Sequence, residues 1–244
     1  MRGPVALAGS GEYLPEMLEV ERGLITGRPG RYVQIPTAAA PEGPDRLAYW
    51  VRLGLEQAER LGVTGVPLVV RDRQDAEDPQ IADQVAGAGL VYLSGGDPRY
   101  LAATLRDTLV WAAVLAAWEQ GAALAGCSAG AMALAGWVPD LRHPRGATPA
   151  DGTGLGVVSR LRVIPHFGRM GRFLPDRIAD LTAGTALRPP TGTLLVGIEE
   201  DTALVGGPDR FTVEGRGAGW ILGRGTRFRL GPGRVLDLTD PPTG

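Results

Sequence analysis

Residues 122–135 read AALAGCSAGAMALA, and this stretch is the strongest indicator of the fold class. An apolar run precedes the pentapeptide GCSAG (residues 126–130), and a run of helix-forming residues follows it. A strand, the pattern G-x-S-x-G and a helix, in this order, are typical of a nucleophile elbow, a tight turn that holds one side chain above the carboxyl edge of a sheet. Small residues flank the serine because larger side chains would collide where the strand and helix backbones approach each other. The stretch therefore predicts an α/β fold with a nucleophile at Ser128.

Cys127 is the alternative nucleophile. It occupies the first x of the motif, so the glycine spacing puts Ser128 at the apex, and we interpret Cys127 as a buried neighbour. The motif alone is weak evidence, because a chain with 37 glycines can match it in an ordinary glycine-rich turn. Its position between a strand and a helix favours the elbow.

Strands and helices alternate through the first half of the chain, which is typical of a three-layer sandwich: a mainly parallel sheet with helices on both faces. Apolar runs predict strands at residues 5–8, 31–35, 66–70, 90–93 and 122–125, and helices at 45–61, 79–86, 98–105 and 109–119. From residue 194 onward, short alternating runs between glycines predict antiparallel hairpins at the sheet edge. We expect residues 140–153 to form a loop that acts as a lid, and residues 1–244 to form a single domain.

The composition argues against several classes of function. The net charge is −2 and the arginines are scattered, so we expect no nucleic-acid partner. No apolar run is long enough to span a membrane and no signal peptide is evident, so we expect a cytoplasmic protein. The chain has no lysine, no asparagine, one cysteine and two histidines, which excludes a Ser–Lys dyad and a Cys-His-Asn triad. We expect neither a metal nor another cofactor.

A serine nucleophile needs a base, and only His143 and His166 can supply an imidazole. His166 follows an apolar run, so it is predicted at the end of a strand, where Ser128 also lies. His143 lies in the irregular segment between Arg142 and Pro144, where a solvated histidine is the simpler interpretation. We therefore favour His166 as the base.

The orienting acid and the oxyanion hole are less narrowly defined by the residues alone. Three acids (Glu199, Glu200 and Asp201) follow the predicted strand at 194–198, and because successive side chains point in opposite directions, one of them can face inward. The backbone N–H of Ala129 and that of Gly95 or Gly96 would form the oxyanion hole.

Four segments in this order resemble the family of serine peptidases that contains cyanophycinase and dipeptidase E. They are SGGD (94–97), GCSAGA (126–131), PHF (165–167) and GIEEDTAL (197–204). The resemblance implies a class I glutamine amidotransferase-like fold and suggests a homodimer. It also implies site residues, namely a Ser128, His166 and Glu200 triad, an oxyanion hole at Gly96 and Ala129, and substrate binding by Asp97, Arg169 and Arg172.

The chain departs from cyanophycinases beside its histidine. Ile164 and Pro165 stand where those proteins carry Asp-Gln, Pro98 replaces a glutamine, and the run of arginines after His-Phe is shortened. We therefore expect a serine hydrolase that retains the chemistry and cleaves a peptide or isopeptide bond of a small or acidic peptide. Two alternatives stay open: a catalytically silent relative that binds a peptide or serves as a scaffold, and, ranked lower, a glutamine amidotransferase-like amidase.

Overall fold

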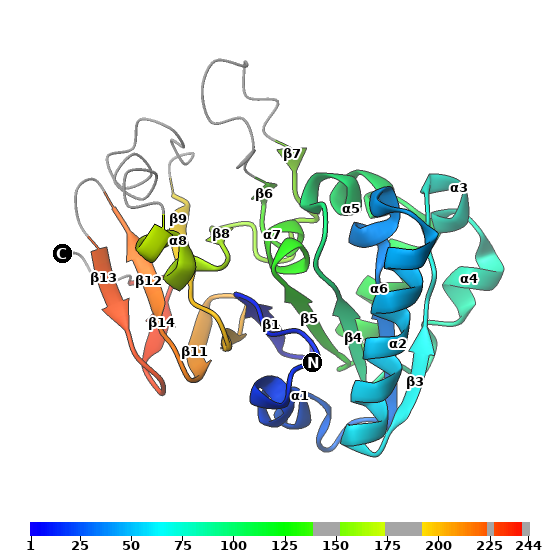
Figure 1. Ribbon diagram of the computed structural model, residues 1–244, viewed down its shortest axis with the longest axis horizontal. Coiled ribbons are helices and arrows are strands. Elements are labelled where there is room, and N and C mark those ends of the chain that lie inside the picture. The colour runs from blue at the N-terminus through cyan, green and yellow to red at the C-terminus, as the bar shows by residue number, and fades with distance from the viewer. Residues whose placement is uncertain (139–151, 174–191, 224–226, 241–244) are drawn as a thin grey trace.

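The computed structural model describes residues 1–138, 152–173, 192–223 and 227–240. Its centre is an eight-stranded sheet in the order β14-β11-β10-β1-β5-β4-β2-β3 (Figure 1). The neighbouring strands β1, β5, β4, β2 and β3 run parallel to one another, whereas β10, β11 and β14 each run antiparallel to their neighbours. Their bounds are β1 (Val5–Ala8), β2 (Arg31–Ile35), β3 (Thr64–Pro67), β4 (Leu90–Leu93), β5 (Ala123–Cys127), β10 (Thr202–Gly206), β11 (Arg210–Gly215) and β14 (Val235–Asp237).

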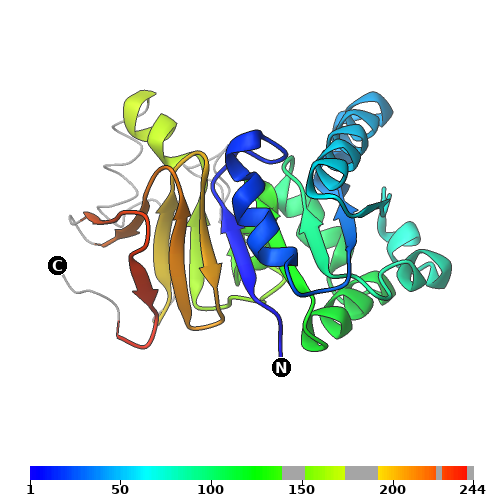
Figure 2. The same ribbon diagram turned by 90° about the horizontal axis from the view of Figure 1, so that it is seen from below.

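Alternating side chains of the parallel strands build a core on each face of this sheet. Val5 and Leu7 of β1 belong to one core, and Ala6 and Ala8 to the other, because successive side chains of a strand point to opposite faces. The core around Ala6 and Ala8 is covered by α1 (Leu18–Ile25) and α2 (Pro44–Leu61). The other is covered by α3 (Arg73–Ala76), α4 (Pro79–Asp83), α5 (Pro98–Leu105), α6 (Leu109–Glu119) and α7 (Ala129–Leu134). Figure 2 shows the sheet between these two helical layers.

A second sheet of four strands packs beside the antiparallel end of the first (Figure 2). Its order is β13-β12-β9-β8, with bounds β8 (Leu161–Ile164), β9 (Leu194–Ile198), β12 (Gly219–Leu222) and β13 (Arg227–Leu230). Val163 and Val196 lie in the same apolar core as Leu204 of β10, so the two sheets share a core. The remaining elements are the pair β6 (Trp137–Val138) and β7 (Gly152–Thr153), helix α8 (Phe167–Phe173), and 3-10 helices at Pro15–Met17 and Thr37–Glu42.

The α/β fold class predicted from the sequence is confirmed, with a mainly parallel sheet, helices on both faces and antiparallel C-terminal strands. The arrangement of the last strands was predicted correctly only in part. Only β10, β11 and β14 extend the edge of the main sheet, whereas β9, β12 and β13 form the second sheet. The strand predicted at 66–70 is instead β3 at Thr64–Pro67, and one further backbone bond follows it, from the N–H of Leu68 to the carbonyl oxygen of Gln34 at 2.8 Å. Of the predicted lid, residues 140–151 lie outside the described residues, and Gly152–Thr153 form β7.

Within the described ranges, no single helix is both long and apolar enough to cross a membrane. Helices α5 and α6 pass such a test only as a pair, and they meet at an angle of 91°.

Candidate active site

The turn between β5 and α7, with Ser128 at its apex, has the backbone geometry expected of a nucleophile elbow. Ser128 has φ 51° and ψ −108°, a backbone conformation that residues with a side chain rarely adopt and that recurs at functional sites. Its small neighbours are required, because a Cβ on Gly126 would overlap the backbone of Gly130, and one on Gly130 would overlap the carbonyl oxygen of Leu93. Ser128 is partly accessible, whereas the residues on either side of it are buried.

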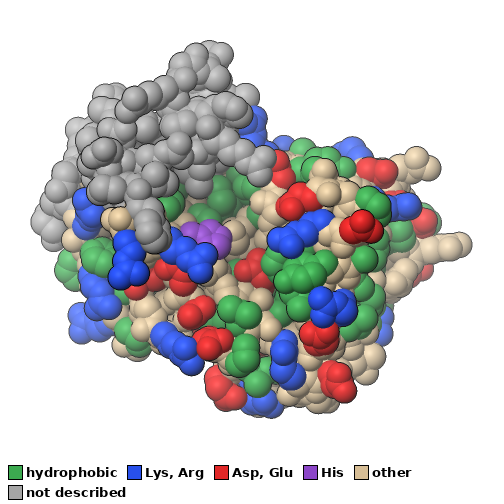
Figure 3. Space-filling model, viewed as in Figure 1, with side chains coloured by type: hydrophobic (Ala, Val, Ile, Leu, Met, Phe, Trp, Pro, Cys, Tyr) green, Lys and Arg blue, Asp and Glu red, His purple; other side chains and the backbone are tan. Residues whose placement is uncertain are grey.

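His166 reaches Ser128 from the second sheet. Strand β8 ends at Ile164, and His166, with φ 53°, immediately precedes α8. The Nε2 atom of its ring lies 2.9 Å from Oγ of Ser128. Figure 3 shows a histidine side chain, in purple, in a hollow of the molecular surface. The structure thus brings the predicted nucleophile and the predicted base into hydrogen-bond contact.

Gly9, at the end of β1, allows the two sheets to meet at this point. A Cβ on Gly9 would overlap the carbonyl oxygens of Ile198 and Glu199, where β9 ends. The carbonyl oxygen of Gly9 accepts the backbone N–H of His166 at 3.2 Å, and its own N–H donates to the carbonyl oxygen of Thr202 at 2.9 Å. Backbone contacts at one glycine therefore hold His166 against the elbow.

The oxyanion hole predicted from the sequence needs backbone N–H groups beside the elbow that are not already bonded to an acceptor. The N–H of Gly95 is not one of them, because it donates to Oε1 of Glu12 at 3.1 Å. Neither Gly96 nor Ala129 donates its N–H to another residue in the described part of the chain. Ala129 is the first residue of α7, and the first N–H groups of a helix have no intrahelical acceptor. Of the two glycines considered from the sequence, the geometry favours Gly96.

The acids that follow β9 hold different partners. Glu199 accepts hydrogen bonds from the backbone N–H of Ala218 and from Nε1 of Trp220, both at 2.8 Å, which tie it to the second sheet. Oε1 of Glu200 accepts the backbone N–H of Arg169 at 3.0 Å.

The structure differs here from the triad expected by resemblance. Among the described residues, the His166 ring has one hydrogen-bond partner, Ser128. Glu200 instead contacts the first turn of α8, the helix that His166 begins, and accepts an N–H that the helix leaves without a partner.

The three predicted substrate-binding residues lie on two helices. Asp97 caps α5, because its Oδ1 accepts the backbone N–H groups of Arg99 at 2.9 Å and Tyr100 at 3.0 Å. Arg169 and Arg172 are exposed on α8 and lie three residues apart, so they share one side of that helix. The two arginines come three and six residues after His166 in the chain.

Cys127 is not poised to act as a nucleophile. Its thiol is fully buried and donates to Oε2 of Glu12 at 3.0 Å. Burial above all, and then the negative charge of Glu12, raise the pKa of Cys127 well above its usual value, so the reactive thiolate is disfavoured. The sequence reasoning missed Glu12, although a signal was present: it directly follows Gly9-Ser10-Gly11 at the carboxyl end of the first strand.

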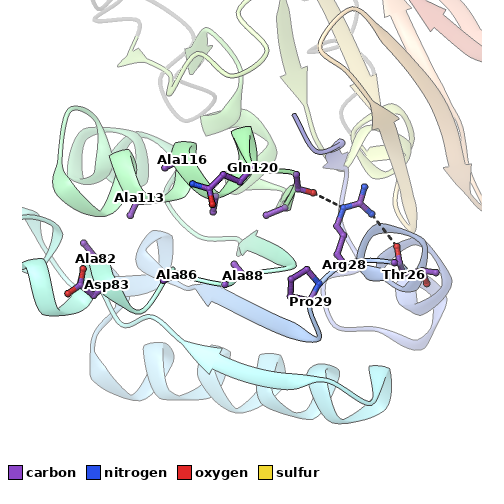
Figure 4. Close-up of a pocket in the computed structure, with 15 residues that line it drawn as sticks. Thr26, Arg28, Pro29, Ala82, Asp83, Ala86, Ala88, Ala113, Ala116 and Gln120 are labelled. Carbon is purple, nitrogen blue, oxygen red and sulfur yellow. Dashed lines mark hydrogen bonds between the residues drawn. The ribbon is translucent and has the colours of Figure 1, made fainter. Parts of the chain in front are cut away.

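A cavity of about 640 Å³ lies at the opposite end of the main sheet (Figure 4). It is lined by Ala88 and Ala122, which precede β4 and β5, and by Arg28, whose Nε donates to the carbonyl oxygen of Gly121 at 2.9 Å. Because Ser128 follows the carboxyl end of β5, this cavity is separate from the elbow. Within the ranges that the structure describes, no cluster of three or more His, Cys, Asp or Glu side chains is suited to hold a metal.

Comparison with known proteins gives consistent matches. The sequence profile of Peptidase family S51 matches residues 5–213. The cyanophycinase of Trichormus variabilis is 30% identical over 198 residues, which are 76% of this chain and 60% of that protein. The cyanophycinase of Synechococcus elongatus is 30% identical over 220 residues, 85% of this chain and 62% of that protein. The chain therefore spans about three fifths of the length of these relatives.

Two solved structures are similar over nearly the whole chain. A peptidase from an acI-B1 Actinobacterium superposes with a TM-score of 0.85 at 40% identity and covers 97% of both chains. A putative peptidase E from Listeria monocytogenes EGD-e has a TM-score of 0.61 at 15% identity, with 88% of this chain and 99% of that chain covered, which shows a shared fold. On the profile match and the sequence identities, the chain belongs to peptidase family S51, a family of serine peptidases.

Proposed function

We propose that this chain is a serine hydrolase that cleaves a peptide or isopeptide bond through an acyl-enzyme. The observation that carries the proposal is the 2.9 Å contact between Oγ of Ser128 and Nε2 of His166, at an elbow whose serine is partly accessible. A serine hydroxyl becomes an effective nucleophile when an adjacent base accepts its proton, and this pair has the required geometry.

The proposed reaction has two halves. As Oγ of Ser128 attacks the amide carbon, Nε2 of His166 takes the hydroxyl proton, and the carbonyl oxygen becomes an oxyanion near the N–H groups of Gly96 and Ala129. His166 then gives its proton to the leaving nitrogen, the C–N bond breaks, and the acyl group stays on Ser128. A water molecule, deprotonated by His166, attacks the ester. When the tetrahedral intermediate collapses, the acid product leaves and the proton returns to Ser128.

For Glu200 we propose a positioning role. Its carboxylate accepts the N–H of Arg169 in the first turn of α8, and His166 is the residue from which that helix starts. A carboxylate at the amino end of a helix stabilises that end. We therefore propose that Glu200 holds His166 through the helix backbone, in place of a direct bond to the ring.

We propose a small acidic peptide as the substrate. Arg169 and Arg172 are exposed on the helix that follows the proposed base, and two guanidinium groups on one side of a helix can bind a carboxylate. A panel of α- and β-linked aspartyl and arginyl dipeptides tests this choice, and cleavage of arginyl peptides alone would refute it. The homodimer and the cytoplasmic location stay predictions.

Labelling with a fluorophosphonate probe tests the proposed chemistry. We expect the wild-type protein to be labelled, Ser128→Ala to be silent, and Cys127→Ala to retain labelling, with circular dichroism as the control for folding. An unlabelled wild-type protein would favour a peptide-binding relative. Hydrolysis of a glutamine amide that is lost in Cys127→Ala and kept in Ser128→Ala would favour a glutamine amidotransferase-like amidase.

A further inference from the structure

Two consecutive residues after β1 hold the loop that carries the proposed oxyanion donor. We call residues 94–97, between β4 and α5, the oxyanion loop. Oε1 of Glu12 accepts the N–H of Gly95 at 3.1 Å, and the hydroxyl of Tyr13 is hydrogen-bonded to Oγ of Ser94 at 2.9 Å. The donor assigned to the oxyanion, the N–H of Gly96, belongs to the next peptide unit.

The turn that carries Glu12 and Tyr13 is itself firmly held. Gly11 has φ 88° and Tyr13 has φ 63°, and a non-glycine residue in this region persists only where its surroundings enforce it. Tyr13 is 2% exposed, and Arg60 donates to its carbonyl oxygen at 2.7 Å. Gln34 donates to its hydroxyl at 2.8 Å, so this buried hydroxyl is held by two side chains, Gln34 and Ser94.

Glu12 also contacts the elbow. Its Oε2 accepts the thiol hydrogen of Cys127, the residue before the nucleophile, at 3.0 Å. A Cβ built on Gly95 would overlap Oε1 of Glu12 and would lie 3.6 Å from Cβ of Ser128, so these three residues are close neighbours. One carboxylate therefore joins the oxyanion loop to the strand that ends at the nucleophile.

We infer that Glu12 and Tyr13 are positioning residues of the proposed hydrolase, and this inference rests on the proposed function. Their bonds to Ser94 and Gly95 fix the peptide units that precede Gly96, and so place its N–H relative to the N–H of Ala129. An oxyanion hole acts only when its donors are preorganised around the developing charge, and loss of one donor costs roughly 10²–10³ in rate. A misplacement of about 1 Å can cost on the order of 10²-fold.

The test compares rates of fluorophosphonate labelling among folded variants. We expect Glu12→Ala to be labelled roughly 10²-fold more slowly than wild type, because the loop loses its acceptor. Glu12→Gln keeps an oxygen for the N–H of Gly95 and is expected within about tenfold of wild type. Tyr13→Phe, which loses the bond to Ser94, is expected about tenfold slower. Glu19→Gln is the matched control. Glu19 is 81% exposed on α1, and its substitution removes the same charge as Glu12→Gln.

A purely structural role predicts a different pattern. It would lower the melting temperature of the variants while leaving the labelling rate of the folded protein unchanged. For a cleaved dipeptide, the inferred role predicts a loss in kcat with little change in KM, because the oxyanion forms only during reaction.

The outcomes separate this inference from the proposed function. A folded Glu12→Ala protein labelled at the wild-type rate overturns the inference, and so does a Glu12→Gln protein as slow as Glu12→Ala. If Glu12→Ala does not fold, wild-type rates in both Glu12→Gln and Tyr13→Phe overturn it. A wild-type protein that shows no labelling dependent on Ser128 refutes the proposed function, and the inference falls with it.

Discussion

Replacing Glu21 with glutamine is expected to remove a pH-dependent loss of stability. Glu21 lies on α1 and is 1% exposed, and the hydroxyl of Tyr32 donates to its Oε2 at 3.0 Å. Burial raises the pKa of this carboxyl from 4.5 to about 7, against smaller lowering effects from Tyr32, Gln57 and Arg60. The folded protein therefore holds the Glu21 proton more tightly than the unfolded chain does.

The sign and the size follow from this difference. Below pH 4.5 the carboxyl is protonated in both the folded and the unfolded state, so its ionisation does not change the free energy of unfolding. As the pH rises, the unfolded chain loses its proton first, so the folded state is progressively disfavoured until the folded carboxyl also ionises near pH 7. At about 1.4 kcal/mol per pH unit, the interval from 4.5 to about 7 corresponds to about 3 kcal/mol of unfolding free energy.

Urea unfolding of the wild-type and Glu21→Gln proteins between pH 4.5 and 8 measures this effect. Taking the difference between the two proteins cancels the titration of every other group, and we expect the stability of Glu21→Gln relative to wild type to rise by about 3 kcal/mol over this interval. Glu19→Gln, on the exposed side of the same helix, should leave the wild-type profile unchanged. Parallel curves for Glu21→Gln and wild type would refute the reasoning.

Substitutions at three further positions test the site. Gly9→Ala is expected to abolish labelling of Ser128, because the new Cβ would collide with backbone where the two sheets meet. Gly23→Ala is the control and should be labelled normally, because the space around Gly23 is open. Equal labelling of the two variants would contradict this account. Glu200→Gln should be labelled at a rate within about tenfold of wild type, because the glutamine side-chain oxygen still accepts the N–H of Arg169. Glu200→Ala should be labelled more slowly. Equally severe losses of labelling rate in both variants would instead indicate that Glu200 acts directly on the imidazole. In steady-state kinetics, Arg169→Ala should raise KM for aspartyl dipeptides about tenfold. Arg227→Ala, which removes an exposed arginine of β13, is the control and should leave KM unchanged. The same KM in both variants would contradict a role for Arg169 in substrate binding.

The parts of the fold that follow local rules could be predicted from the sequence. Strands β1, β2 and β4 have the expected bounds, because each is a short, mainly apolar run ended by glycine, proline or serine. The elbow was predictable for the same reason, since the small residues that surround Ser128 are required by contacts within a few positions of it.

Contacts between distant segments could not be predicted in this way. Residues 194–198 and 202–206 alternate alike, yet β9 joins the second sheet and β10 the first. Gly9 lies close against the end of β9, a contact between distant segments that no local pattern encodes. Glu12 was missed because its partner Gly95 lies 83 residues away, and Glu200 was expected at the imidazole although its carboxylate lies at the start of α8.

The proposed proton transfer takes place at the seam between the two sheets, that is, at their interface, because Ser128 follows a strand of one sheet and His166 follows a strand of the other. Loosening that seam would separate base from nucleophile while both sheets kept their own hydrogen bonds. The activity of the protein then depends on how firmly the two sheets pack together. In mild denaturant, activity should be lost before the helical circular-dichroism signal declines.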